Sequence, residues 1–256
     1  MTKIIALFNQ AGGVGKSTLT LNLGYHLVQR KHRVLLVDLD PQASLTTFMG
    51  IEPSELKTSL YDALVNSQTL PIHQSIHGLD IVPTNINLSV AELELVGAMN
   101  REARLKNILS PLAEKYSIIL IDCPPSLGIL TVLGLTASTH ILVPIETEFK
   151  SYFGTGLLLD TVGKVRHHVN PHLAFAGFVP MKFDKRRSQH SRTLEQMEQE
   201  LKPLATVFPP VPDSTVFPDS TEERVPLAVY KPKHPAIKVL KEIAEGVEKA
   251  LFSKSV

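Results

Sequence analysis

The chain contains one cysteine, Cys123, and no tryptophan among its 256 residues. A single cysteine excludes a disulfide framework and any C-x-x-C metal or iron–sulfur site within one chain. No apolar run approaches the length that a bilayer-spanning helix needs. The first three residues lead directly into an apolar run and do not resemble a signal peptide. We therefore expect a soluble, cytoplasmic protein.

Net charge is also nearly absent, because 26 Lys and Arg residues face 25 Asp and Glu residues, for a formal charge of +1. Any contact with nucleic acid must therefore come from a local basic patch. The chain has no glycine- or proline-rich linker, no low-complexity tract and no internal repeat. We expect one domain that spans residues 1–256.

What the chain does have is a glycine-rich stretch at 10–18, between an apolar run at 4–8 and a helical pattern that extends to about residue 30. This order of strand, glycine loop and helix is the context of a phosphate-binding loop. Glycines let backbone N–H groups turn inward and form an anion nest at the helix N-terminus. The pattern predicts that Lys16 reaches the β- and γ-phosphates of ATP and that the Ser17 hydroxyl ligates Mg²⁺. Gln10 replaces the first glycine of the usual motif, so the match is to a variant. The other loop residues expected to contact the nucleotide are Gly12, Gly13, Val14, Gly15 and Thr18.

Acidic residues follow two of the apolar runs. Asp38 and Asp40 come after the run at 33–37, and Asp122 ends the run at 117–121. Open α/β sheets bind ligands at the carboxyl ends of their strands. Taken alone, the acids would be better explained as a helix cap or as part of a solvated turn. Beside a phosphate-binding loop, we expect Asp38 and Asp40 to flank the metal ion and the attacking water. We expect Asp38, Asp122 and Ser17 to form the metal site.

The remaining pattern predicts strands at 79–83, 140–145 and 173–179, and helices at 88–115, 154–168, 188–202 and 236–252. Residues 43–78 are expected to form helices and loops, and residues 207–213 to be irregular. Strands that alternate with helices predict an α/β fold. We expect a P-loop NTPase domain with a mostly parallel sheet covered by helices on both faces.

Three segments, at 10–18, 37–42 and 121–126, together resemble the ParA/MinD family of deviant Walker-A ATPases. The resemblance extends over nearly the whole chain, because residues 144–148 and 212–213 also look like ParA segments. It implies Mg²⁺-dependent ATP hydrolysis and an ATP-bound sandwich homodimer that binds nonspecific double-stranded DNA on the nucleoid. It also implies a partner protein that stimulates hydrolysis, releases the dimer and links it to a cargo such as a plasmid or chromosome. Within the site, the resemblance favours Asp40 as the residue that positions the attacking water. We also expect nucleotide contacts from Met181, Pro212 and Asp213.

One position departs from the family. Its signature lysine, which precedes the glycine pair and reaches the partner's phosphates across the dimer, is Ala11 here. In lacking that lysine the chain is similar to the McdA branch, which positions carboxysomes and related microcompartments. We predict that Lys150, after the strand at 140–145, supplies the missing cation from a different backbone position. The alternative is that Lys150 is an ordinary exposed lysine.

Basic residues form two groups that could contact DNA phosphates without reading sequence. The leading group is Lys182, Lys185, Arg186 and Arg187, and the second is Lys231, Lys233 and Lys238. A MinD-like membrane-associated ATPase is the nearest alternative, but the mixed Lys and Glu residues of the last helix are typical of a helix docked on a core. A biosynthetic P-loop enzyme is a second alternative, for which we find no constellation of substrate-binding residues.

Overall fold

The computed structural model describes residues 2–252, apart from the side chains at 151 and 153, so the expected domain of residues 1–256 extends past the described part at both ends. Its centre is a seven-stranded sheet with the order β3-β4-β2-β5-β1-β6-β7. Every neighbouring pair is parallel except β3 and β4. The prediction of a mostly parallel sheet is therefore confirmed. The strands are β1 (Lys3–Leu7), β2 (Val34–Asp38), β3 (His73–Ile76), β4 (Leu79–Val82), β5 (Ile118–Asp122), β6 (His140–Glu146) and β7 (Ala174–Met181).

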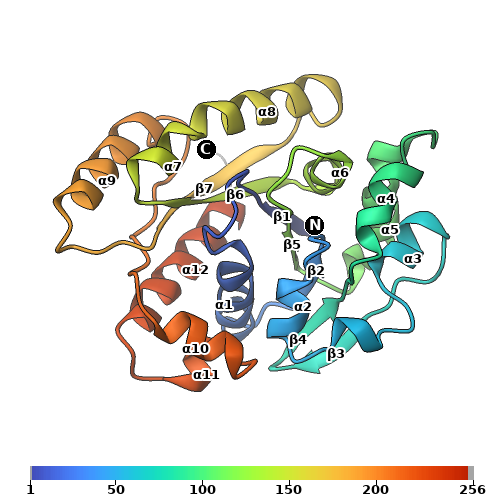
Figure 1. Cartoon of the computed structure of the whole chain (residues 1–256), viewed down its shortest axis with the longest axis horizontal. Coiled ribbons are helices and arrows are strands. Elements are labelled where there is room, and N and C mark those ends of the chain that lie inside the picture. The colour runs from blue at the N-terminus through green and yellow to red at the C-terminus, as the bar shows by residue number, and fades with distance from the viewer. Residues whose placement is uncertain (1, 253–256) are drawn as a thin grey trace.

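Helices cover both faces of the sheet (Figure 1). Successive side chains of a strand point to opposite faces, and each face here has its own apolar core. Leu36 packs in one core with residues of α1 and α12, whereas Leu35 packs in the other with residues of α5, α6 and α8. Double coverage explains why the central strands are continuous apolar runs rather than alternating ones. These covering helices are α1 (Lys16–Gln29), α5 (Arg104–Leu109), α6 (Ile129–Ala137), α8 (Thr155–His168) and α12 (Ala236–Phe252).

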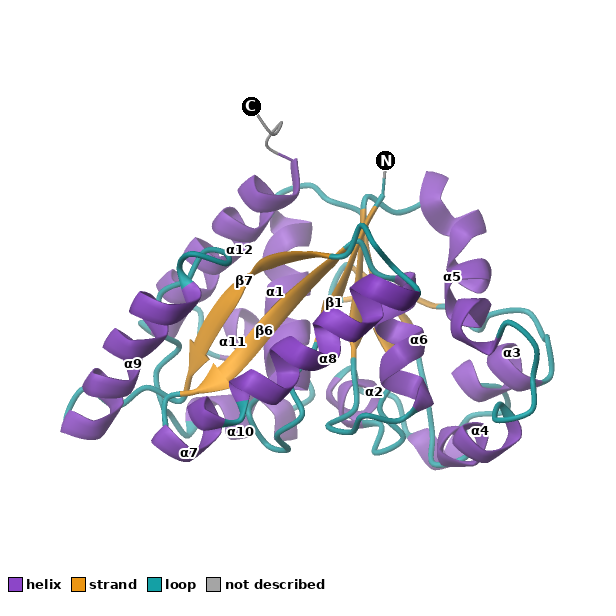
Figure 2. Ribbon diagram, turned by 90° about the horizontal axis from the view of Figure 1, so that it is seen from above, coloured by secondary structure: helices purple, strands orange, loops and turns teal. Residues whose placement is uncertain are grey.

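The remaining helices are mostly short and lie in the connections. They are α2 (Ser44–Phe48), α3 (Leu60–Val65), α4 (Leu88–Glu94), α7 (Phe149–Phe153), α9 (Ser188–Leu201), α10 (Val216–Glu222) and α11 (Leu227–Tyr230), with 3₁₀ turns η1 (Pro53–Glu55), η2 (Arg101–Ala103) and η3 (Ser110–Glu114). The arrowheads of β6 and β7 point towards α7, and α2 and α10 lie along the same side of the molecule (Figure 2). The ligand-binding edge of the sheet is therefore bordered by short, irregular connections.

Two predictions about the chain's organisation are wrong. Residues 43–78 contain the strand β3, which pairs antiparallel with β4 at the edge of the sheet. Its residues 73–75 are exposed, so no apolar pattern marks it. The expected helix at 88–115 is broken, because Asn100 adopts a left-handed φ of 52° between α4 and η2. The short helices α7, α10 and α11 were not predicted. Each is seven residues or fewer, too short to show a helical period clearly.

Candidate functional site

The glycine-rich loop connects β1 to α1 in the conformation that a phosphate-binding loop requires. Gly13 and Gly15 have positive φ angles of 72° and 92°, which L-residues with side chains rarely adopt. A Cβ atom at Gly15 would also lie 2.9 Å from the terminal methyl carbon of Met181. Gly15 is the residue from which α1 begins. The loop can therefore present its backbone N–H groups at a helix N-terminus while it passes close to the end of β7.

Buried polar contacts hold this loop in place. The side chain of Asn9 accepts a hydrogen bond from the Ala11 amide at 2.9 Å and donates one to the Pro144 carbonyl at 2.7 Å, which ties the loop to β6. The Lys16 ammonium donates to the Ala11 carbonyl at 3.1 Å and is 6% exposed. Burial lowers the pKa of Lys16, against the charges of Asp122 and Asp40. Lys16 therefore lies inside the loop, among the predicted acids.

Asp38 and Asp122 are direct neighbours on adjacent parallel strands, β2 and β5. Both carboxyl groups are fully buried, and burial is the main cause that raises the pKa of each. Thr20 of α1 donates to Oδ1 of Asp122 at 3.4 Å. Oδ2 of Asp122 is buried and has no hydrogen-bond partner within residues 2–252. An unsatisfied carboxylate oxygen beside a phosphate-binding loop is chemically suited to a metal ion or to its bound water.

Asp38 is hydrogen-bonded to its own chain at both oxygens. Oδ2 accepts from the amide and the hydroxyl of Thr46, and Oδ1 accepts from the amide of Asp40 at 3.2 Å. Asp40 is only partly buried, and its carboxylate accepts the Gln42 amide at 3.0 Å. Asp38 therefore organises the loop that carries Asp40, and Asp40 is the more accessible of the two acids. Their division of roles in hydrolysis stays a prediction.

The donor set around Asp122 fits Mg²⁺ only with help from a nucleotide. Within the described part of the chain, no group of three or more His, Cys, Asp or Glu side chains could hold a metal ion by itself. Mg²⁺ usually keeps several waters and takes further oxygens from phosphates. Here the Ser17 hydroxyl could coordinate the ion directly, and Oδ2 of Asp122 could orient a bound water. Because Asp38 has other partners, direct coordination by Asp38 has less structural support.

A cavity of about 360 Å³ adjoins the phosphate-binding loop. The lining includes the predicted contacts Met181, Pro212 and Asp213 together with four loop residues, Gly13, Val14, Gly15 and Thr18. The 211–213 segment is held beside the end of β7, where the Phe183 amide donates to the Val211 carbonyl and the Asp213 amide donates to the Phe183 carbonyl, both at 2.9 Å. The structure therefore brings these three residues to the loop. A cavity next to a phosphate nest is suited to the base and sugar of a nucleotide.

Lys150 lies in α7, directly after the carboxyl end of β6, and its side chain is exposed. Ala11 lies in the loop that Asn9 ties to the same strand through Pro144. Both residues therefore lie along one edge of the sheet. Whether Lys150 replaces the missing lysine stays a prediction, because its partner would belong to a second copy of the chain.

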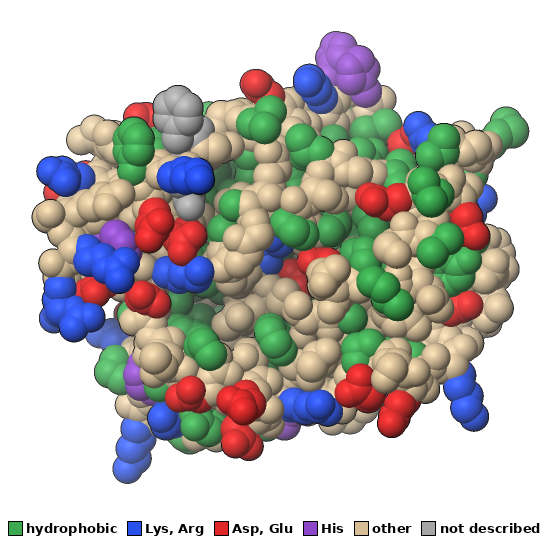
Figure 3. All heavy atoms as spheres, in the orientation of Figure 1, with side chains coloured by type: hydrophobic (Ala, Val, Ile, Leu, Met, Phe, Trp, Pro, Cys, Tyr) green, Lys and Arg blue, Asp and Glu red, His purple; other side chains and the backbone are tan. Residues whose placement is uncertain are grey.

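The predicted DNA-binding cluster is interleaved with acids. Lys182 pairs with Glu146 at 3.0 Å, and Arg186 forms a forked hydrogen-bond pair with Asp184, whose pKa is held well below its usual range by that contact. Arg187 lies 3.9 Å from both Asp184 and Glu148. Basic and acidic side chains alternate on one side of the face shown in Figure 3. Internal carboxylates therefore offset much of the cluster's charge.

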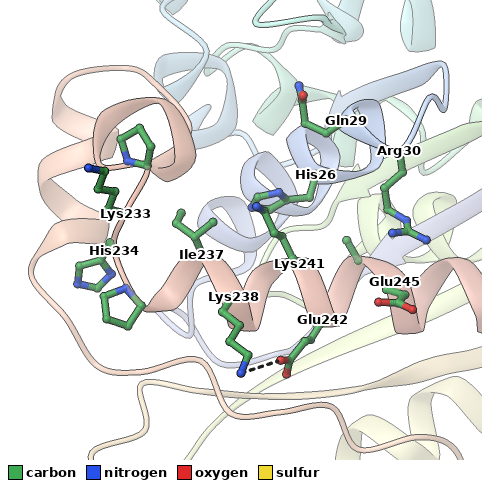
Figure 4. A pocket seen from close by; sticks show the side chains of 13 residues that line it. His26, Gln29, Arg30, Lys233, His234, Ile237, Lys238, Lys241, Glu242 and Glu245 are labelled. Atoms are coloured by element: carbon green, nitrogen blue, oxygen red, sulfur yellow. Dashed lines mark ion pairs between the residues drawn. The ribbon is translucent and has the colours of Figure 1, made fainter.

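The second basic group extends from α11 to the start of α12. The Lys231 ammonium lies 5.0 Å from the centre of the Tyr230 ring, and Lys233 lines a cleft between α1 and α12 (Figure 4). Lys238 is 85% exposed and pairs only loosely, at 3.9 Å, with Glu242. These cations are less neutralised by acids than the cluster at 182–187.

Asn9, Thr20 and Thr46 are site residues that the sequence analysis missed. The side chain of each donates a hydrogen bond to a residue elsewhere in the chain. Asn9 donates to Pro144, Thr20 to Asp122 and Thr46 to Asp38. Only Asn9, at the junction of the apolar run and the glycine loop, carried a positional signal. Nothing in the spacing of Thr46 from Asp38 indicates a contact.

A parallel sheet, a glycine-rich loop before α1 and acids at the ends of β2 and β5 define a P-loop nucleotide-binding protein. A family model described as an AAA domain (AAA_31) matches residues 2–175. The sporulation initiation inhibitor protein Soj of Bacillus subtilis is 36% identical over 252 residues, which cover 96% of this chain and 98% of Soj. The chain therefore belongs to the ParA/MinD family of P-loop ATPases.

Solved structures extend the comparison to bound nucleotides. Cobyrinic acid a,c-diamide synthase from Mycobacterium smegmatis, with bound ADP and magnesium, is 32% identical and has a TM-score of 0.87, over 99% of this chain and 96% of that chain. An ATP complex of a Cyanothece McdA variant is 22% identical and has a TM-score of 0.85, over 100% of this chain and 98% of that chain. The likeness to McdA shows the fold alone, so the McdA branch stays a prediction.

Proposed function

We propose that this chain binds ATP with Mg²⁺, forms an ATP-bound homodimer and binds nonspecific double-stranded DNA. Hydrolysis, stimulated by a small adaptor protein, then releases the dimer. In this cycle Lys16 neutralises charge that develops on the γ-phosphate, Ser17 and Asp122 serve the metal, and Asp40 positions the attacking water. The observation that carries the proposal is the unpartnered, buried Oδ2 of Asp122 between the phosphate-binding loop and Asp38.

The nucleotide-binding part of the proposal is supported by two features of the site. The loop, Lys16 and the acids are preorganised by buried hydrogen bonds, and the adjoining cavity of about 360 Å³ brings Met181, Pro212 and Asp213 to the loop. The neighbouring M. smegmatis structure holds ADP and magnesium in the same fold. ATP is the substrate that this combination fits best.

DNA is favoured over a membrane as the surface to which the dimer binds. The apolar face of α12 is buried against the sheet, with Leu240, Ile243 and Val247 at most 2% exposed. A membrane-binding amphipathic helix would have to keep such a face free for lipid. None of the helices within residues 2–252 is long and apolar enough to cross a bilayer. The cations at 182–187 and 231–233 are therefore proposed to contact phosphates of a duplex.

A second candidate function comes from the synthase name of the M. smegmatis neighbour. An ATP-dependent amidating enzyme would transfer the γ-phosphoryl group, or activate a carboxylate, at the same loop. It would need a second substrate beside Asp40. A groove of about 430 Å³ lies there, between residues 41–43 and 85–87. Among the residues that the structure describes, no basic side chain lines this groove to receive a substrate carboxylate, which disfavours the synthase function.

The proposal about the cargo rests on the family to which the chain belongs and not on the geometry of the site. We propose that the DNA-bound dimer partitions or positions a large cargo over the nucleoid: a plasmid, a chromosome or, if the chain belongs to the McdA branch, carboxysomes. The protein would then be cytoplasmic and nucleoid-associated. Purification together with the product of a neighbouring gene would identify the adaptor.

Steady-state ATP hydrolysis, with and without duplex DNA, tests the proposed function. We expect DNA-stimulated release of phosphate, and retention on random-sequence duplex with ATP but not with ADP. Retention should fall steeply as salt rises, because each neutralised phosphate releases counterions. Equal retention with ATP and ADP, or retention that salt does not change, would count against DNA binding by an ATP-dependent dimer. Formation of an amidated product would favour the synthase instead.

A further inference from the structure

A second cavity lies away from the phosphate-binding loop. It is a cleft of about 600 Å³ between the carboxyl-terminal half of α1, the loop at 232–235 and the first turns of α12 (Figure 4). Its volume is within the range of small-molecule sites. The cleft starts about ten residues along α1 from Lys16, or about 15 Å away. It is therefore separate from the nucleotide site, although α1 connects the two.

An unsatisfied buried group lies at the base of this cleft. His26 is 3% exposed, and its Nε2 atom has no hydrogen-bond partner within residues 2–252. In Figure 4 the imidazole ring points from α1 towards α12, and Lys241 extends from α12 towards it. An orphaned ring nitrogen costs free energy unless a ligand supplies a partner. Lys241 is exposed, so its flexible side chain can move to admit one.

The charges around the cleft are predominantly positive. Lys233 and Lys241 line it, and neither has an ion-pair partner among the described residues. Of the acids in the lining, Glu245 pairs with Lys249 at 2.9 Å, and Glu242 lies 3.9 Å from Lys238. Arg30, at the far end, pairs with Glu248. Beside the imidazole of His26, the Lys241 ammonium therefore remains to receive an anion (Figure 4).

The walls between these groups are apolar. Pro232, Pro235, Ile237 and Ala244 line the cleft between the cations. Such walls suit a ring or hydrocarbon portion of a ligand, while the Lys241 ammonium beside the imidazole suits an anionic group. A phosphate monoester combines both features. A duplex backbone fits less well, because its phosphates are single charges on the outside of a wide helix and would reach the exposed Lys233 rather than the buried His26.

We propose that the cleft between α1 and α12 binds the phosphate group of a small phosphorylated molecule, which lies between Lys241 and His26. Neutral His26 donates its Nε2–H to a phosphate oxygen, and the Lys241 ammonium offsets the negative charge. The ligand would be held by α1, the helix that starts at Lys16, and by α12. Burial, and then the charge of Lys241, lower the pKa of His26 to about 4, so the free imidazole is neutral at pH 7.

Isothermal titration calorimetry with phenyl phosphate tests this proposal on the full chain. Saturating Mg-ADP keeps the probe out of the phosphate-binding loop, and benzyl alcohol is the uncharged control ligand. We expect one saturable site for phenyl phosphate and none for benzyl alcohol. Lys241→Ala and His26→Gln should each weaken binding by about tenfold or more. Lys164→Ala, an exposed lysine on α8, is the matched control and should bind as the wild type does.

Two outcomes would overturn the proposal. The first is the absence of saturable phenyl phosphate binding by the wild type, or unchanged binding by Lys241→Ala. Because Lys241 is exposed, that variant is expected to fold even if His26→Gln does not. The second is displacement of duplex DNA by phenyl phosphate, together with loss of DNA retention in Lys241→Ala. That result would assign the cleft to the DNA backbone rather than to a small molecule.

Discussion

The amide and the hydroxyl of Thr46 both donate to Oδ2 of Asp38, at 2.8 and 2.7 Å. This contact joins the first turn of α2 to the end of β2, and both residues are fully buried. The Thr46 hydroxyl also accepts the Thr84 amide at 3.0 Å, so it links three segments. The position of Asp40, two residues after Asp38, depends on this arrangement.

Thr46→Val should therefore destabilise the protein and impair its nucleotide site. The substitution keeps the shape of the side chain but leaves a buried carboxylate and the Thr84 amide each short of one partner. We expect a loss of about 1–3 kcal/mol in the free energy of unfolding. Urea denaturation measures it. Thr47→Val is the matched control, because the Thr47 hydroxyl donates to the Ala43 carbonyl within its own helical turn. Equal losses in the two variants would contradict the prediction.

Asp40→Asn should abolish most ATP turnover and leave ATP affinity nearly unchanged. The amide oxygen of Asn can still accept the Gln42 amide, so the loop should keep its shape while the charge is lost. If Asp40 positions the attacking water, we expect the turnover number to fall by about 100-fold or more. Phosphate release and nucleotide binding are measured side by side. Asp160→Asn, at an exposed position of α8, serves as the control. Unchanged turnover would remove Asp40 from the mechanism.

Lys150→Ala should prevent ATP-dependent dimerisation and, with it, DNA binding. The reason is that Ala11 cannot supply a cation to a partner's phosphates, whereas an exposed lysine at the end of β6 could. ATP affinity of the monomer should change little. Multi-angle light scattering with ATP gives the dimer population. A population equal to that of the wild type, and of Lys164→Ala, would mean that Lys150 is an ordinary surface lysine.

Buried His26 should make stability depend on pH. Its pKa is about 4 in the folded protein, because of burial and then of Lys241, and about 6.5 when unfolded. The unfolded state therefore binds more protons between these values, and stability falls as pH drops from about 6.5 towards 4. Above that window the contribution is constant. From the difference between the two pKa values, the total effect should be about 3 kcal/mol.

Urea denaturation at pH 7.5 and pH 5.0 measures this dependence. His26→Gln should lose less stability than the wild type between the two pH values. His172→Gln, at an exposed position, should match the wild type. If His26→Gln also follows the wild-type profile, other groups cause the pH dependence.

Much of the fold was predictable because it is encoded locally. The runs at 4–8, 34–37 and 118–121 are apolar throughout, as strands covered on both faces must be, and they became β1, β2 and β5. The phosphate-binding loop was predictable for the same reason: Gly13 and Gly15 are required by the loop's own backbone angles. The edge strand β3 was not, because an edge strand with exposed polar residues carries no apolar pattern.

The same distinction between local and long-range features applies to the site. The amino-acid sequence alone determined the loop with Lys16 and Ser17 and the acids that end two strands, since the spacing of a motif along the chain suffices to place them. Only the tertiary structure decided that Asp38 accepts hydrogen bonds from Thr46, that Oδ2 of Asp122 has no partner among the described residues and that Lys182 is paired with Glu146. Those facts depend on contacts between residues far apart in the chain. Burial and partner choice are set where segments meet, and the local pattern of residues does not specify which segments meet.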